Sequence, residues 1–215
     1  LMSTKLSVPN PSPQLIKEAE SVKEASILLG QATNKQRCEA LSEMANALND
    51  NTDKVLKANL IDLERSEKEG LKKSLLSRLQ LTETKYKGCI NGVLKVSNLT
   101  DPIGNRQLHR KLDENLILQR VTVPLGVLGV IFESRPDALI QIASLAVRSG
   151  NGALLKGGSE ARMTNQAIMD ALEKGLANSE VGKGALSLLT TRQESLGLLR
   201  LDRFVNLIIP RGSNE

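Results

Sequence analysis

The chain has 215 residues, of which 40% are hydrophobic and 1% aromatic, and a formal net charge of +5. This length and composition predict a folded protein with a buried core, and the scarcity of aromatic rings argues against a module that stacks single-stranded nucleic acid. No apolar run of about 18 residues is present and the N-terminus does not resemble a secretory signal, so we expect no membrane span and a cytoplasmic protein.

Thiols and imidazoles are too few to build a disulfide framework or a metal site. Cys38 and Cys89 are not in CxxC spacing and His109 is the single histidine, so we predict no metal and a reducing compartment. Both cysteines fall in helical patterns at core-like positions, and we interpret them as structural. Most basic residues have an acidic neighbour in sequence, which indicates solvated helix faces and no nucleic-acid partner.

Residues 1–104 are predicted to form a helical region that packs on the rest of the chain. Apolar residues recur there at spacings typical of amphipathic helices. We expect helix N-caps at Asn34, Thr52 and Thr82 and helix ends at Gly30 and Gly70. The apolar positions expected on buried faces are Leu15, Ile16, Ala19, Val22, Cys38, Leu41, Met44, Ala45, Leu48, Val55, Leu56, Leu60, Leu63, Tyr86, Ile90, Val93 and Leu94.

Residues 105–123 are predicted to form a β-hairpin. It follows a turn at residues 101–104, "DPIG". Two extended segments, "LHRKLD" and "LILQRVTV", are joined around Glu114 and Asn115, as expected for antiparallel strands.

Residues 124–215 predict an α/β unit. The runs "GVLGVIF", "GALLK", "ALSLL" and "VNLII" are short and continuously apolar, which is typical of parallel strands covered on both faces. Helical patterns at 138–148, 161–176 and 193–201 separate them. We therefore expect a doubly wound parallel sheet whose ligand lies in the crevice at the carboxyl ends of the strands.

Three of these strands end in unusual sequences: "ESRPD" at 133–137, "KGGSE" at 156–160 and "PRGSNE" at 210–215. Arg135, Lys156 and Arg211 place positive charge there, and helix N-termini offer free N–H groups, so we expect an anionic ligand such as a phosphate. The glycines allow close approach to a ligand or a sharp turn. The alternative is that the glycines are only turn residues and the basic side chains extend into solvent.

The chain contains neither GxGxxG nor GxxxxGK[ST], so the common dinucleotide fingerprint and the P-loop are absent from the sequence. The stretches "VPLGVLGVIFESRPDALIQIASLAVRSGNGALLKGGSEA" and "LDRFVNLIIPRGSNE" resemble the glutamate-5-semialdehyde dehydrogenases, also called gamma-glutamyl phosphate reductases, especially the reductase part of bifunctional delta-1-pyrroline-5-carboxylate synthases. The resemblance extends from about Glu18 onward. It implies an aldehyde dehydrogenase-like Rossmann variant, since the family belongs to the aldehyde dehydrogenase superfamily.

The resemblance implies NADPH or NADP as the cofactor. Lys156 matches a lysine that reaches the adenosine ribose, and Ser159 stands where NAD-preferring relatives carry a glutamate, so a 2′-phosphate would meet no negative charge there. Gly212 and Ser213 match the Gly-Ser pair beside the pyrophosphate and nicotinamide. The other cofactor-binding residues implied by the matched motifs are Ser134, Gly157, Gly158 and Arg211.

Arg135 stands where most of the superfamily has an oxyanion-hole asparagine. The resemblance implies that it holds the oxyanion or the phosphate of L-glutamyl 5-phosphate in a forked contact; alternatively it orients a carboxylate partner, Glu133 or Asp137. The implied reaction is the NADPH-dependent reduction of that acyl phosphate to L-glutamate 5-semialdehyde in proline biosynthesis. The family's nucleophilic cysteine lies beyond this chain, so we expect the chain to be the cofactor-binding half and inactive alone.

Two other functions remain open: an NAD-dependent aldehyde dehydrogenase of another family, and a non-catalytic nucleotide-binding or scaffolding module. The hairpin resembles the projecting oligomerisation arm of the superfamily, which implies a homodimer or a higher homo-oligomer. The resemblance to the bifunctional synthases leaves open a fused or partner glutamate kinase, with a fused domain preceding Leu1.

Overall fold

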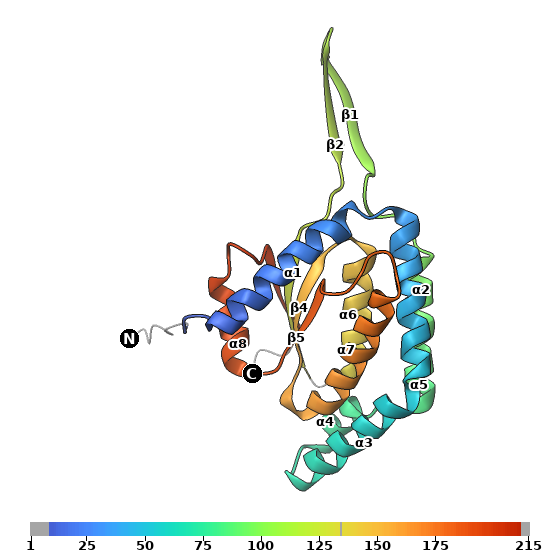
Figure 1. Cartoon of the computed structure of the whole chain (residues 1–215), viewed down its shortest axis with the longest axis vertical. Coiled ribbons are helices and arrows are strands. Elements are labelled where there is room, and N and C mark those ends of the chain that lie inside the picture. Colours follow the sequence, from blue (N-terminus) through green and yellow to red (C-terminus); the bar gives the residue numbers. More distant parts are fainter. Residues whose placement is uncertain (1–8, 134, 212–215) are drawn as a thin grey trace.

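The computed structural model of the chain describes residues 9–133 and 135–211 (Figure 1). Its helices are α1 (Pro13–Gln31), α2 (Asn34–Asp50), α3 (Thr52–Lys68), α4 (Lys73–Leu79), α5 (Glu83–Ser97), α6 (Pro136–Arg148), α7 (Arg162–Ala177) and α8 (Arg192–Gly197), with 3₁₀ turns at Ser159–Ala161 and Leu198–Arg200. Its strands are β1 (Arg106–Asp113), β2 (Leu116–Val121), β3 (Val127–Phe132), β4 (Gly152–Lys156), β5 (Leu186–Leu189) and β6 (Leu207–Arg211). None of the helices in these two ranges is long and apolar enough to cross a membrane.

Four parallel strands form the central sheet, in the order β5-β4-β3-β6. Successive strands step outward from β3 to β4 and β5, and the chain then returns to the other side of β3 to form β6. Strands β5-β4-β3 are ordered as in one half of a doubly wound dinucleotide-binding sheet, β6 takes the place of the first strand of the other half, and the topological switch point lies between β3 and β6. The predicted parallel α/β sheet is confirmed.

Helices cover both faces of this sheet (Figure 1). On one face α1 lies across β3, β4 and β5, where Leu15 and Val22 share a buried cluster with Val127 and Leu154. On the other face α6 and α7 pack against the strands, and α2, α3 and α5 pack on those two helices. The N-terminal helices therefore share buried cores with the α/β unit, α1 mainly in one cluster and α2, α3 and α5 in another.

Several details of the helical region differ from the prediction. Thr33, not Asn34, caps α2, because Thr33 and Gln36 form a reciprocal capping box. Thr52 is the first residue of α3 and Asn51 is its cap, whereas the predicted cap at Thr82 is confirmed. Helix α1 continues to Gln31, one residue past the predicted end at Gly30, while Gly70 follows α3 with a positive φ of 80° as predicted.

The buried stripe of α3 has a different phase from the one predicted. Its buried residues are Val55, Ala58, Asn59, Asp62 and Ser66, so three polar side chains face inward, whereas Leu60 is exposed. Ile16 and Leu94, also predicted in the core, are exposed too. The predicted helical period of three to four residues is correct. The buried face is shifted because Asn59 and Asp62 make buried hydrogen bonds to residues outside α3.

Strands β1 and β2 form the predicted antiparallel hairpin, which projects far from the body of the molecule (Figure 1). Its base is fixed by a buried cluster in which Asp101 receives hydrogen bonds from Arg37 (2.6 Å) and the Ile103 amide (3.0 Å). Arg148 of α6 lies 3.9 Å from the same carboxylate oxygen and donates to the Leu99 carbonyl. The cluster ties the arm to α2 and α6.

Candidate functional site

The carboxyl ends of β3, β4 and β6 lie at one edge of the sheet, as parallel pairing requires. Arg211 is paired in register with Phe132 at the end of β3, and Lys156 with Ile131. The predicted site residues Ser134, Gly212 and Ser213 lie outside the described residues. Of the other predicted residues, Lys156, Gly157, Gly158 and Ser159 line a hollow at this edge, and Arg135 lines a separate one. Arg211 is exposed at the end of β6 and lines neither of them.

The first hollow, here called the edge groove, has a volume of about 390 Å³ and contains the predicted Lys156–Glu160 loop. It is lined by Ile131, Phe132, Glu133, Lys156, Gly157, Gly158, Ser159, Glu160, Thr190, Arg192 and Ser195. Two cations, three hydroxyls and two carboxylates therefore converge on one groove at the ends of the strands. The cations and hydroxyls can donate hydrogen bonds to phosphates, and the carboxylates can accept them from sugar hydroxyls.

Neighbouring side chains lie close to both glycines of the loop. A Cβ on Gly157 would lie 2.3 Å from the Asn165 side-chain nitrogen, and a Cβ on Gly158 would lie 1.8 Å from a carboxylate oxygen of Glu160. Neither glycine has a positive φ. The absence of a positive φ leaves open a turn that any residue could form, and the Ala161 amide does donate to the Gly158 carbonyl at 3.2 Å. Close approach of these glycines to a ligand stays a prediction.

Lys156 ends β4 with its side chain partly buried beside this loop, where its Nζ donates to the Gly157 carbonyl. Burial lowers the pKa of this ammonium, although Glu160 and Glu194 act in the opposite direction. A partly desolvated ammonium gains more from an added anionic or hydroxyl-rich ligand than a fully solvated lysine would. The geometry therefore does not favour the interpretation of Lys156 as a solvent-exposed side chain.

Helix α3 holds this loop in place, which the sequence did not indicate. Asp62 is fully buried and accepts hydrogen bonds from the Thr164 amide and hydroxyl, both at 2.7 Å, and so caps the first turn of α7. Arg65 pairs with Asp62 at 2.8 Å and donates to the carbonyls of Ser159 (3.1 Å) and Glu160 (2.9 Å). The N-terminal helical region thus positions the Ser159–Glu160 turn.

A second, wider hollow opens on the outer side of this turn, with a volume of about 700 Å³. Arg65, Lys72 and Arg162 line it together with Ser159, and Glu69 and Glu160 are the acidic residues of the wall. The basic side chains come from three separate stretches of chain. They place positive charge beside Ser159.

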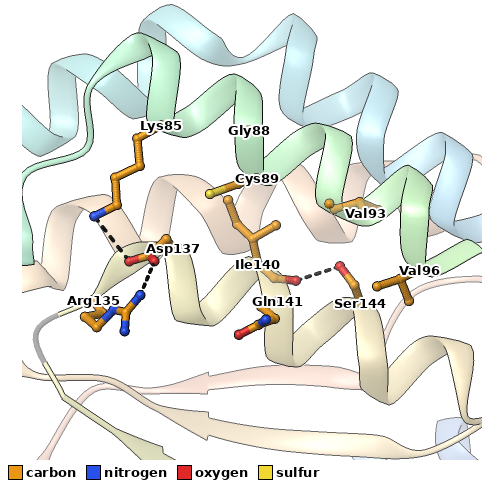
Figure 2. A pocket seen from close by; sticks show the side chains of 11 residues that line it. Lys85, Gly88, Cys89, Val93, Val96, Arg135, Asp137, Ile140, Gln141 and Ser144 are labelled. Atoms are coloured by element: carbon orange, nitrogen blue, oxygen red, sulfur yellow. Dashed lines mark hydrogen bonds and ion pairs between the residues drawn. The ribbon is translucent and has the colours of Figure 1, made fainter.

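Arg135 faces a different hollow, a cavity of about 270 Å³ between α5 and α6 that we call the helix cavity (Figure 2). Figure 2 shows Lys85, Arg135 and Asp137 gathered at one end, Cys89 and Ile140 in the middle, and Val96 and Ser144 at the other end. The cavity is thus charged at the sheet edge and mainly apolar farther along the helices.

The charged end is an ion-pair chain. Arg135 Nη2 lies 2.9 Å from one carboxylate oxygen of Asp137, and Lys85 Nζ lies 3.5 Å from the other. Of the two partners that we considered for Arg135, the side chain pairs with Asp137, while its backbone amide donates to the Glu133 carbonyl. The guanidinium remains more than half exposed at 58%, so it can pair with Asp137 and still meet a ligand.

Cys89 lines the helix cavity together with Arg135, although 46 positions separate them in sequence. Its side chain also packs against the main core, and burial raises the pKa of its thiol. Cys38 lies elsewhere, on α2, with its sulfur 3.2 Å from the Ser97 carbonyl. The sequence placed both cysteines in core-like helix positions but gave no sign that one of them borders the site.

Comparisons with known proteins match the chain over nearly its whole length. It is 85% identical over 214 residues to the gamma-glutamyl phosphate reductase of Prochlorococcus marinus, covering 100% of this chain and 49% of that relative. The crystal structure of gamma-glutamyl phosphate reductase from Thermotoga maritima is 34% identical with a TM-score of 0.89, covering 93% of this chain and 49% of that one. The chain spans about half the length of the curated relatives it matches.

A more distant structure shows the fold alone. The crystal structure of a putative aldehyde dehydrogenase from Bacillus subtilis is 16% identical and has a TM-score of 0.66, covering 91% of this chain and 40% of that one. No model of a known protein family matches the chain. The predicted aldehyde dehydrogenase-like α/β fold is confirmed by these structural likenesses.

Proposed function

Because the chain is homologous over its whole length to gamma-glutamyl phosphate reductases, we propose that it forms the cofactor-binding part of an enzyme that reduces L-glutamyl 5-phosphate to L-glutamate 5-semialdehyde with NADPH. The observation that carries this proposal is the position of Arg135, which follows β3 beside the switch point of the sheet and lines the helix cavity, while Glu133, two residues earlier, lines the edge groove. A dinucleotide in the groove and an anionic acyl substrate in the cavity would meet beside this side chain.

The residues of the edge groove fit a dinucleotide. Lys156 and Arg192 offer cationic donors, Ser159 and Ser195 offer hydroxyls, and the carboxylate of Glu133 offers an acceptor for ribose hydroxyls. When bound, the nicotinamide group supplies the hydride for the reduction. The role of the chain is to bind and orient this cofactor through the loop that Asp62 and Arg65 hold in place.

We further propose NADPH in preference to NADH. Ser159 brings no negative charge toward a 2′-phosphate, and the wider hollow beside it is lined by Arg65, Lys72 and Arg162. A phosphate dianion gains from such a cluster, whereas the 2′-hydroxyl of NADH does not. Glu69 and Glu160 line the same hollow and offset part of this positive charge.

On the substrate side, Arg135 would hold the phosphate of the acyl phosphate or the negative charge that develops on its carbonyl oxygen. A guanidinium can do this with two parallel hydrogen bonds while Asp137 fixes its orientation. The projecting β1–β2 hairpin supports a homo-oligomeric assembly, because its side chains are almost all exposed along both strands. Such an arm gains burial only against another chain.

The test uses a completed protein, in which this chain is joined to the half of the Prochlorococcus marinus relative that it does not cover. We expect oxidation of L-glutamate 5-semialdehyde with NADP⁺ that requires inorganic phosphate. Oxidation that proceeds equally well without phosphate and prefers NAD⁺ would indicate an ordinary aldehyde dehydrogenase instead. Nucleotide binding with no turnover of any aldehyde would indicate a non-catalytic module.

A further inference from the structure

The helix cavity contains two cations, of which the proposed function uses only Arg135. The second is Lys85, which comes from α5 in the N-terminal helical region. The sequence assigned this region to packing alone. Lys85 lies near Arg135 at the charged end of the helix cavity (Figure 2). The role of this second positive charge is therefore open.

Asp137 bridges the two cations without neutralising them. Its carboxylate lies 2.9 Å from Arg135 and 3.5 Å from Lys85, so the three groups carry a net positive charge of about one unit. The oxygen facing Lys85 is buried and takes no hydrogen bond from the described residues, while Lys85 Nζ donates to the Gln80 carbonyl at 3.2 Å. Lys85 is therefore held near Asp137 but is not bound tightly to it, and its remaining donors can reach a ligand.

The wall of the cavity leaves room for a small ligand beside these charges. A Cβ built on Gly88 or on Gly92 of α5 would meet no atom within 4 Å. The volume of about 270 Å³ is close to the lower end, about 300 Å³, of pockets that bind small molecules. Open space with paired cations at one end and apolar walls formed by Val93 and Ile140 suits a short aliphatic chain with an anionic group.

We propose that Lys85 and Arg135 together form a two-cation site for an oxyanion of the substrate, and that Asp137 is the positioning residue that sets their separation. This inference rests on the proposed function for the identity of the substrate. The oxyanion is either the phosphoryl group or the α-carboxylate of the glutamyl substrate, since lysine and arginine recognise both in the same way. Helix α5 then supplies a specificity-determining residue to a site whose other cation follows β3.

Cys89 provides a reporter of anion binding that needs no turnover. In the completed protein, the rate at which N-ethylmaleimide modifies Cys89 is measured by peptide mass spectrometry, with Cys38 as the internal reference. Phosphate or L-glutamate, but not chloride at equal ionic strength, should slow modification of Cys89 and leave Cys38 unchanged. In Lys85→Met the concentration needed for protection should rise about ten-fold or more, as expected for loss of one charge-assisted contact.

Lys87→Met is the matched control, because Lys87 lies on the same helix and, within residues 9–133 and 135–211, pairs only with Glu83, at 2.7 Å and exposed to solvent. In Lys87→Met, the anion should protect Cys89 at the same concentration as in the wild-type protein. In Lys85→Arg, most of this protection should remain. Protection by phosphate identifies the phosphoryl group, and protection by L-glutamate alone identifies the α-carboxylate. Equal behaviour of Lys85→Met and Lys87→Met, or no protection by either anion, would overturn the proposal.

Steady-state kinetics give the second readout. Lys85→Met should raise the KM for phosphate, or for L-glutamate 5-semialdehyde if the carboxylate is bound, by about ten-fold or more while the KM for NADP⁺ stays within about two-fold. An altered KM for NADP⁺ alone would also contradict the proposal. If the completed protein has no reductase activity, the proposed function fails, but the Cys89 experiment still decides whether the anion site exists.

Discussion

Replacing Asp62 with alanine should destabilise the chain far more than its position in a charged helix suggests. The buried carboxylate accepts four hydrogen bonds, from Arg65, the Met163 amide, and the amide and hydroxyl of Thr164. The alanine variant leaves the buried Thr164 groups without this acceptor, at about 1–3 kcal/mol for each unsatisfied group. It also removes the cap of α7, worth about 0.5–2 kcal/mol.

These costs overlap, because the Thr164 amide is part of the cap, and water can enter the space that the carboxylate leaves. We therefore expect a loss of about 3 kcal/mol in the free energy of unfolding. This corresponds to a decrease in Tm of about 6–12 °C for a chain of this length. Asp62→Asn keeps one acceptor oxygen and should cost about half as much.

The assay is urea unfolding followed by far-UV circular dichroism, since the chain has no tryptophan to report by fluorescence. Glu64→Ala is the control, because Glu64 is exposed on the same helix, and it should change stability by less than about 0.5 kcal/mol. Equal stability of Asp62→Ala and Glu64→Ala would show that the carboxylate does not cap α7. A large change in the urea dependence would show that the variant altered the unfolded state instead.

Three further predictions follow from the other sites. Lys156→Ala should weaken NADPH binding by about 1.5–3 kcal/mol, measured by titration in the completed protein, and an unchanged affinity would place Lys156 outside the cofactor site. Arg135→Lys should lower kcat/KM for the acyl phosphate but leave cofactor affinity unchanged, because an ammonium cannot form the fork; loss of NADPH binding instead would assign Arg135 to the dinucleotide. Burial raises the pKa of Asp101, but hydrogen bonds from Ile103 and Arg37 outweigh this effect, so the pKa is lowered overall. The stabilising contribution of Asp101 is therefore present above about pH 4 and is lost as the pH falls further. The difference in unfolding free energy between wild type and Asp101→Asn, measured with urea, should shrink between pH 7 and pH 3, and a constant difference would contradict this.

The strands and the hairpin could be predicted from the sequence, because each depends on local information. A short continuous apolar run, such as 127–132, has few alternatives to a strand covered on both faces. The hairpin likewise follows from two extended segments joined by Glu114 and Asn115. The positions of Arg135 and Lys156 at one sheet edge then follow from the topology alone.

The contribution of the N-terminal helices to the site could not be predicted in the same way. Asp62 and Arg65 lie in the charged stretch "DLERSEKEG", which is typical of a solvated helix face. Their partners, Thr164 for Asp62 and the Ser159 and Glu160 carbonyls for Arg65, lie about 100 positions away. The packing of α3 on α7 and on the turn before it brings them together. The sequence does contain a sign of this face, since Val55, Asn59 and Asp62 share helical spacing. A face that contains polar residues is, however, a weaker candidate for burial than the neighbouring face made of leucines.

Cys89 raises the question of whether it can act as the nucleophile of the reduction, because it is the thiol nearest to Arg135 in the described chain. We expect that it cannot. Burial raises the pKa of this thiol, and nearby Asp137 raises it further, while Lys85 and Arg135 offset only part of this effect. An acyl transfer needs the thiolate, so a thiol with a raised pKa is a poor nucleophile at neutral pH.

The 215 residues alone should therefore show no reductase or dehydrogenase turnover, although Cys89 borders the helix cavity. In the completed protein, Cys89→Ser should keep kcat within about two-fold, since serine is nearly the same size as cysteine and replaces the thiol by a hydroxyl. Cys38→Ser is the matched control, because Cys38 lies on α2 away from the cavity. Turnover by the chain alone that Cys89→Ser abolishes and Cys38→Ser does not would make Cys89 the nucleophile, and the burial that raises its pKa would then have to be relieved when substrate binds.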